Sequence, residues 1–182
     1  SALIHDVVED NSNHTLETIQ KEFGDKIAKI VDGLTKIGKL NTKGYSGVSI
    51  QAENYRKMLL TLNEDVRVII IKIADRLHNM QTLSSMPYEK QIQKASETLY
   101  IYAPLAHRIG LYNIKTELED LGLKYTDPET YDEISKKLIE SKKDQDEYID
   151  KFNSIISSTL TKEKLKYNIK GRTKSIFNIV FE

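Results

Sequence analysis

The sequence of 182 residues has no cysteine, and it has only 8 glycines and 3 prolines. Without cysteine there can be no disulfide scaffold, thiolate metal site or cysteine nucleophile, and a reducing compartment fits this composition. Long apolar runs are absent too, since the longest strongly apolar block, residues 66–71, is interrupted by Arg67. A membrane-spanning helix needs roughly 20 apolar residues. We therefore expect a soluble, cytoplasmic protein with no membrane partner.

Net charge is also missing, because 27 basic side chains balance 27 acidic ones. A protein that coats nucleic acid needs a basic surface, so we expect no direct nucleic-acid binding. The net charge of zero is the sum of an acidic N-terminal segment, a basic segment near the C-terminus and a nearly balanced remainder. Residues 1–20 contain four acidic side chains and no Lys or Arg, whereas residues 161–174 contain six basic side chains against one acidic, a net of +5.

Apolar residues at helical spacing predict a mostly α-helical chain. Residues 2–9 resemble the last turns of a helix, and Asn13 or Thr15 can cap a short helix that ends at Gly24. A helix follows over residues 25–37, then a glycine-containing loop and a helix over 51–62.

Residues 66–83 begin with a β-branched run that could form a buried strand. The run continues without a breaker to Met80 and exceeds the length of a normal strand, which favours a buried helix. Further helices are predicted over 89–107, with a kink at Pro104, over 112–121, and from Pro128 at a first helical position to about residue 160.

Two clusters of residues could carry chemistry. The first is His5-Asp6 in an apolar setting, followed by Glu9 and Asp10 about one helical turn on. Imidazole and carboxylate together suit a divalent metal such as Mn, Fe or Zn. The alternative is a hydrogen-bonded core histidine beside a capping aspartate, with the other two carboxylates on a solvated helix end.

The second cluster is Asp75 in the apolar helix over 66–83, with Asn79 and Thr82 on the same helical face. A buried aspartate has to be paired or bind a metal. Pairing with Arg76, Arg56 or Lys72 is the alternative to a metal site lined by Asn79 and Thr82.

The sequence motifs around these residues are more specific for one protein family than the residues alone. They occur in the order HDVVED (5–10), VDGLTK (31–36), QAENYRKML (51–59), KIADRLHNM (72–80) and IYAPLAHR (101–108). In this order the chain resembles the HD-type hydrolase domain of the RelA/SpoT family, the bifunctional enzymes that make and destroy the alarmone (p)ppGpp in the stringent response. The resemblance covers essentially the whole chain and implies an all-α HD-domain helical bundle.

The resemblance implies a metal, usually Mn²⁺ or another divalent ion, held by His5, Asp6 and Asp75. The family's further ligand, a first His, has no counterpart before His5, so we expect a chain cut at its start and weak or inactive by itself. Glu9 and Asp10 match the acidic pair that activates or positions the attacking water. Asn79 and Thr82 match positions that contact the nucleotide, ppGpp or pppGpp.

The resemblance also divides the chain into a truncated hydrolase domain over 1–126, a helical linker over 127–166 and the beginning of an α/β synthetase domain over 167–182. Arg172 and Lys174 could grip ATP phosphates there, although a solvated basic linker is the favoured interpretation of residues 162–174 within this chain. His78 is expected to pack near Asp75 and His107 to be structural. The parent protein would reach the ribosome through C-terminal domains.

Two functions remain open from the sequence. The first is a (p)ppGpp 3′-pyrophosphohydrolase domain that releases pyrophosphate and leaves GDP or GTP. The second is a catalytically silent helical module that binds guanine nucleotide and regulates an attached (p)ppGpp synthetase, a GTP pyrophosphokinase.

Overall fold

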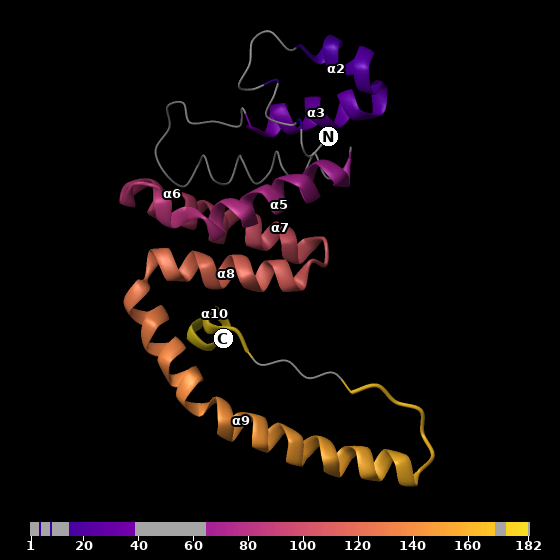
Figure 1. Ribbon diagram of the computed structural model, residues 1–182, viewed down its shortest axis with the longest axis vertical. Coiled ribbons are helices and arrows are strands. Elements are labelled where there is room, and N and C mark those ends of the chain that lie inside the picture. Colours follow the sequence, from indigo (N-terminus) through magenta and orange to yellow (C-terminus); the bar gives the residue numbers. More distant parts are fainter. Residues whose placement is uncertain (1–3, 5–7, 9–14, 39–64, 170–173, 182) are drawn as a thin grey trace. The chain divides into compact units, whose positions relative to one another are not determined.

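The computed structural model describes residues 15–38, 65–169 and 174–181, together with residues 4 and 8. Those residues contain helices and no strand, which confirms the all-α prediction for the described part of the chain. The chain divides into two compact units, Ser1–Gly122 and Leu123–Glu182 (Figure 1). The predicted helices over 2–9 and 51–62 lie outside the described residues. No described helix is long and apolar enough to cross a membrane.

Two described helices of the first unit are joined at a glycine, α2 (Leu16–Phe23) and α3 (Asp25–Gly38). The Thr15 side chain caps α2 by accepting a hydrogen bond from the Thr18 backbone N–H, and Gly24 ends the helix at φ 81°, as the sequence predicted. The two helices pack together through a buried apolar face, formed by Ile19, Ile30, Val31 and Leu34.

Helix α5 (Val66–Gln81) confirms the choice of helix over strand for the β-branched run. Asp65 caps its N-terminus by accepting from the Arg67 backbone N–H, and the helix buries apolar side chains along most of its length, at Val68, Ile69, Ile73 and Met80. Against α3 the approach is close. A Cβ atom on Gly33 would lie 2.9 Å from Val68 Cγ2, so a glycine is needed where the two helices meet.

The single helix predicted over 89–107 is three segments. A short 3₁₀ turn, η2 (Leu83–Ser85), leads to α6 (Tyr88–Glu97), a π-helical turn η3 (Thr98–Tyr102) and α7 (Ala103–Arg108). Pro104 explains the break, because its ring clashes with the carbonyl four residues back and its nitrogen cannot donate. The wider turn comes just before it, with the Ala103 N–H bonded to the Thr98 carbonyl, and lets the chain continue as a rod past α5 (Figure 1).

Helix α8 (Tyr112–Thr126) is longer than the predicted 112–121 and runs over the boundary between the units. Within the first unit Gln81 Nε2 donates to Glu117 Oε1 at 2.6 Å and so links the end of α5 to α8. A second close approach is at Gly122, where a Cβ atom would lie 2.6 Å from Leu99 side-chain atoms.

The second unit consists mainly of α9 (Pro128–Lys162), which starts where the sequence predicted. Asp127 accepts from the Thr130 N–H at 3.1 Å, and Pro128 takes the first turn. The C-terminus ends in a Schellman motif, since Leu165 N–H bonds to Leu160 O and Lys164 adopts a φ of 54°. Helix α10 (Ile176–Phe181) packs on α9. The predicted start of an α/β domain at 167 stays a prediction.

Candidate functional site on helix α5

Three of the predicted site residues lie at the C-terminal half of α5. Asp75 is half-buried, whereas Asn79 and Thr82 are exposed. Their spacing of four and three residues places them on one helical face. Thr82 is the C-cap residue, and its hydroxyl donates to the His78 carbonyl at 3.0 Å. Its oxygen can still accept a hydrogen bond from a ligand.

The same face of α5 changes character along the helix. Val68, seven residues before Asp75 and therefore on the same side, is buried where α3 approaches at Gly33. Two turns on, about 10 Å along the axis, the face is only half covered at Asp75, and one turn later it is exposed at Asn79. A half-buried carboxylate next to exposed polar groups can contribute to binding a polar ligand or a metal.

On a different side of α5, Arg76 is buried and contacts the last turn of α6 and the π-helical turn η3. Its Nη2 lies 3.0 Å from Glu97 Oε2, and its Nη1 donates to the Lys94 carbonyl at 3.4 Å. The guanidinium carbon lies 4.1 Å from the centroid of the Tyr102 ring. The structure thus gives Glu97 as a partner of Arg76, and the pairing of Asp75 stays a prediction.

Sequence reasoning missed Glu97 and Tyr102 as partners of Arg76. The available signal was the arginine itself, because a basic residue inside an apolar helix has to find a carboxylate. Which carboxylate it finds depends on how α5 packs on the rod of α6, η3 and α7, and residues 76 and 97 are 21 positions apart.

The two histidines near these elements are both exposed. His78 precedes Asn79 on α5, and its carbonyl helps to end that helix. His107 lies at the end of α7, where its ring contacts the Tyr112 ring edge-on at 5.6 Å between centroids. The contact joins two consecutive helices and fits the structural role expected for His107.

The other predicted site residues are spread differently. His5, Asp6, Glu9, Asp10 and Arg172 lie outside the described residues, and Lys174 is exposed just before α10. Within the described ranges no three His, Asp or Glu side chains are grouped as a metal site would need. The predicted metal ligands, catalytic pair and synthetase residues therefore stay predictions. Of the predicted metal ligands, Asp75 lies among the described residues.

Charge at the other end of α5 has a local role. The Arg67 side chain donates three hydrogen bonds to Asp65, from Nε to Oδ1 at 2.9 Å and to Oδ2 at 3.2 Å, and from Nη2 to Oδ2 at 2.7 Å. These bonds hold the pKa of Asp65 below its ordinary value. An ionised N-cap carboxylate favours the helix start, so this end of α5 is stabilised by its own neighbours.

Comparison with known proteins identifies the stretch that carries these residues. Residues 1–112 match the HD domain family. The chain is 43% identical over 180 residues to a GTP pyrophosphokinase of Myxococcus xanthus, covering 98% of this chain and 24% of that protein. It is 45% identical over 174 residues to a guanosine-3′,5′-bis(diphosphate) 3′-pyrophosphohydrolase of Aquifex aeolicus, covering 96% of this chain and 24% of that protein.

A protein of Vibrio cholerae with the same hydrolase name is 42% identical over 179 residues, covering 98% of this chain and 25% of that protein. The chain thus spans about a quarter of the length of the curated relatives it matches. Relatives named for synthesis and relatives named for hydrolysis are similar to it to nearly the same degree. Their names alone do not choose between the two activities.

Proposed function

The chain belongs to the HD domain family, as a member of the RelA/SpoT group, and on this premise we propose that it is a (p)ppGpp 3′-pyrophosphohydrolase domain. The observation that carries the proposal is where the family match falls. It covers residues 1–112 of the 182, and this stretch contains His5, Asp6 and Asp75.

The proposed metal ligands are His5, Asp6 and Asp75. One imidazole and two carboxylates form a donor set that suits Mn²⁺ and similar divalent ions, and the half-buried position of Asp75 on α5 supports its part in it. When bound, such a metal acts as a Lewis acid that neutralises phosphate charge and makes water more acidic. Mn²⁺ is the proposed ion.

The chain's own residues would supply the remaining chemistry. Glu9 or Asp10 would accept the proton of the attacking water, as a positioned general base. Asn79 and Thr82, exposed beside Asp75 on the same face, can donate and accept hydrogen bonds with the nucleotide. Water then replaces the 3′-pyrophosphate, and the products are pyrophosphate and GDP or GTP.

The test is pyrophosphate release from ppGpp and pppGpp in the presence of Mn²⁺, on the protein encoded by the complete gene. Asp75→Ala should abolish release, because it removes a proposed metal ligand. Asn79→Ala should raise KM more than it lowers kcat, about tenfold for the loss of one hydrogen bond to a charged ligand. Asp132→Ala is the matched control, an exposed aspartate of α9 that should leave release unchanged.

The second candidate function is a silent nucleotide-binding module that regulates a synthetase. The relatives named GTP pyrophosphokinase, at 43% identity in Myxococcus xanthus, favour it. Arg172 and Lys174 would then belong to the start of the synthetase domain. Binding of ppGpp without pyrophosphate release, and without any effect of Asp75→Ala on metal binding, would establish this function and contradict hydrolysis.

A further inference from the structure

We propose that Arg76 is a positioning residue for Asp75 and Asn79, acting by fixing the rotation of α5 about its own axis. This inference rests on the proposed function, since it concerns the same face of the helix. Arg76 itself is on another side of α5 and would touch neither metal nor nucleotide.

The first support is burial. The Arg76 side chain is 9% exposed, and a guanidinium removed from water is costly unless charges and hydrogen bonds replace the lost solvent. Here Glu97 supplies the charge at 3.0 Å, the Lys94 carbonyl accepts a hydrogen bond, and the Tyr102 ring covers a face at 4.1 Å. These contacts come from different directions, so a rotated guanidinium would lose at least one of them.

The second support is that the partners are themselves fixed. The Lys94 carbonyl also accepts from Thr98 Oγ1 at 2.7 Å, which ties the end of α6 to the first residue of η3. Thr98, Tyr102 and the following Ala103 are buried. The π-helical turn that precedes Pro104 determines where the Tyr102 ring lies relative to Glu97. The guanidinium therefore docks on a segment that is held by its own hydrogen bonds and packing.

The third support is the size of the effect on the neighbouring carboxylate. Asp75 is one residue from Arg76, about 100° around the helix and 1.5 Å along it. A rotation of α5 by about 10° moves an atom about 6 Å from the axis by about 1 Å. Metal–ligand distances tolerate about 0.2 Å. Small rotations that a packed apolar face would allow are thus large for a metal ligand.

The other contacts of α5 with described residues restrain its rotation less. The apolar contacts of Val68, Ile73 and Met80 are non-directional. The Gly33 contact sets the distance to α3 at the N-terminal half, and the Gln81–Glu117 hydrogen bond is exposed at the far end. Among the described residues of α5, Arg76 is the buried polar side chain, and its contacts are directional.

The decisive variant is Arg76→Lys in the protein encoded by the complete gene. Lysine keeps the positive charge and loses the planar fork that fits Glu97 and the Tyr102 ring. We expect about tenfold weaker Mn²⁺ binding, measured by the metal-induced rise in Tm and by the Mn²⁺ concentration that gives half-maximal pyrophosphate release. At saturating Mn²⁺ kcat should return to near the wild-type value. Arg67→Lys is the matched control on the same helix, exposed and expected to leave the Mn²⁺ requirement unchanged.

A second pair of variants guards against a folding defect at position 76. Tyr102→Phe keeps the ring face and should retain the wild-type Mn²⁺ requirement, whereas Tyr102→Leu should raise it. Ile19→Ala destabilises the same unit through a buried residue of α2, away from α5. If it lowers Tm as much as Arg76→Lys without changing the Mn²⁺ requirement, loss of stability does not explain the effect.

The inference is overturned if Arg76→Lys and Tyr102→Leu both lower Tm and leave the Mn²⁺ requirement and the metal-induced rise in Tm at wild-type values, while Asp75→Ala abolishes both. If Asp75→Ala itself leaves metal binding and pyrophosphate release unchanged, the proposed function fails, and this inference fails with it. The two failures are therefore distinguishable by the Asp75→Ala variant.

Discussion

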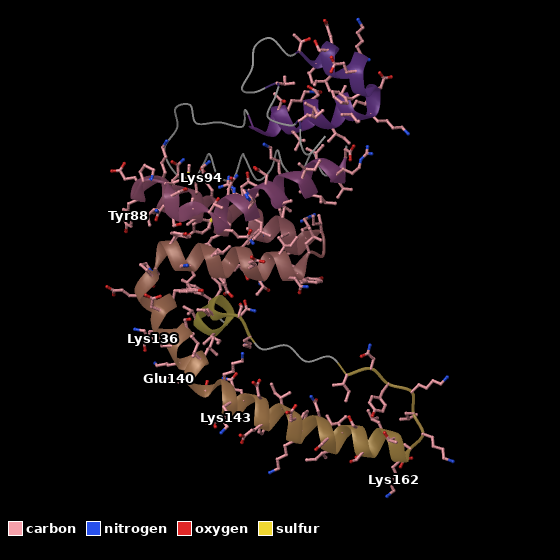
Figure 2. The ribbon with its side chains drawn as sticks, viewed as in Figure 1. Tyr88, Lys94, Lys136, Glu140, Lys143 and Lys162 are labelled. Atoms are coloured by element: carbon pink, nitrogen blue, oxygen red, sulfur yellow. The ribbon has the colours of Figure 1, made fainter. Side chains whose placement is uncertain are left out.

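Helices α5 and α9 contrast in how their side chains are used. Helix α5 has 16 residues and buries five of them, including an arginine, whereas α9 has 35 residues and buries none. The stabilising contacts of α5 come from α3, α6 and η3. The side-chain contacts within α9, whose side chains are drawn in Figure 2, are local, such as the Lys137–Glu133 ion pair and the hydrogen bond from the Ser141 hydroxyl to the Lys137 carbonyl at 2.8 Å.

The contrast shows two sources of helix stability, tertiary packing and local contacts. A short apolar helix with β-branched residues depends on tertiary packing, because its intrinsic propensity is modest. A long charged helix can persist on caps, local pairs and many backbone hydrogen bonds. Large apolar side chains of α9 remain exposed, among them Ile139, Tyr148, Phe152 and Ile155. Substitutions of the same kind should therefore have different effects in the two helices.

The largest expected difference is between two isoleucines. Ile73 of α5 is 1% exposed and Ile155 of α9 is 59% exposed. Ile73→Ala should lower the free energy of unfolding by about 2–5 kcal/mol, because it leaves a cavity. Ile155→Ala should change it by less than about 0.5 kcal/mol. Hydrogen exchange followed by mass spectrometry on peptides from each helix separates the two units.

A large effect at Ile155 would contradict this contrast, since it would mean that the exposed face of α9 is covered in solution. An effect at Ile73 that is no larger than that at Ile155 would contradict the packing of α5.

The next effect concerns the contact between α3 and α5. Gly33→Ala would place a Cβ atom 2.9 Å from Val68 Cγ2. Alanine is normally the better helix residue by roughly 0.5–1 kcal/mol, but here we expect a loss of about 1–3 kcal/mol from overpacking. Urea denaturation measures it. Val68→Ala should relieve the clash, so the double variant should be more stable than the sum of the single changes implies. Additive single changes would show that the helices do not meet at Gly33.

The smallest effect is electrostatic and depends on pH. Asp65→Ala should lower stability by about 1 kcal/mol near neutral pH, through loss of the α5 cap. Arg67 hydrogen bonds lower the pKa of Asp65 in the folded protein. A lowered pKa means that the contribution is present above the ordinary value of about 3.9 and is lost as pH falls through the folded pKa. The wild type and the variant should therefore converge in acid.

The counterpart in α9 is Glu133, whose pKa is lowered by its hydrogen bond from Lys137. Both side chains of this pair are about two-thirds exposed, so Glu133→Gln should give no resolvable change in stability at any pH. A pH-dependent loss for Glu133→Gln equal to that of Asp65→Ala would remove the distinction between the helix ends.

Local sequence signals predicted several of the helix ends. Caps at Thr15 and Asp127, the glycine at 24 and the proline at 128 act on their own backbone neighbours, and the structure has helix ends at each. The extension of α8 to Thr126 and the π-helical turn before Pro104 were not predicted. A proline indicates that a helix is disturbed, but the packing of neighbouring helices decides how the chain accommodates it.

For the candidate site, the sequence by itself determined which residue types share a face of α5, because helical periodicity puts Asp75, Asn79 and Thr82 together. Only the tertiary structure decided which part of that face is open and what pairs with Arg76. Burial depends on how closely α3 approaches through Gly33, and the Arg76 contacts join residues about twenty positions apart. Periodicity along one helix contains no information about a partner on another, so both had to come from the packing of the helices.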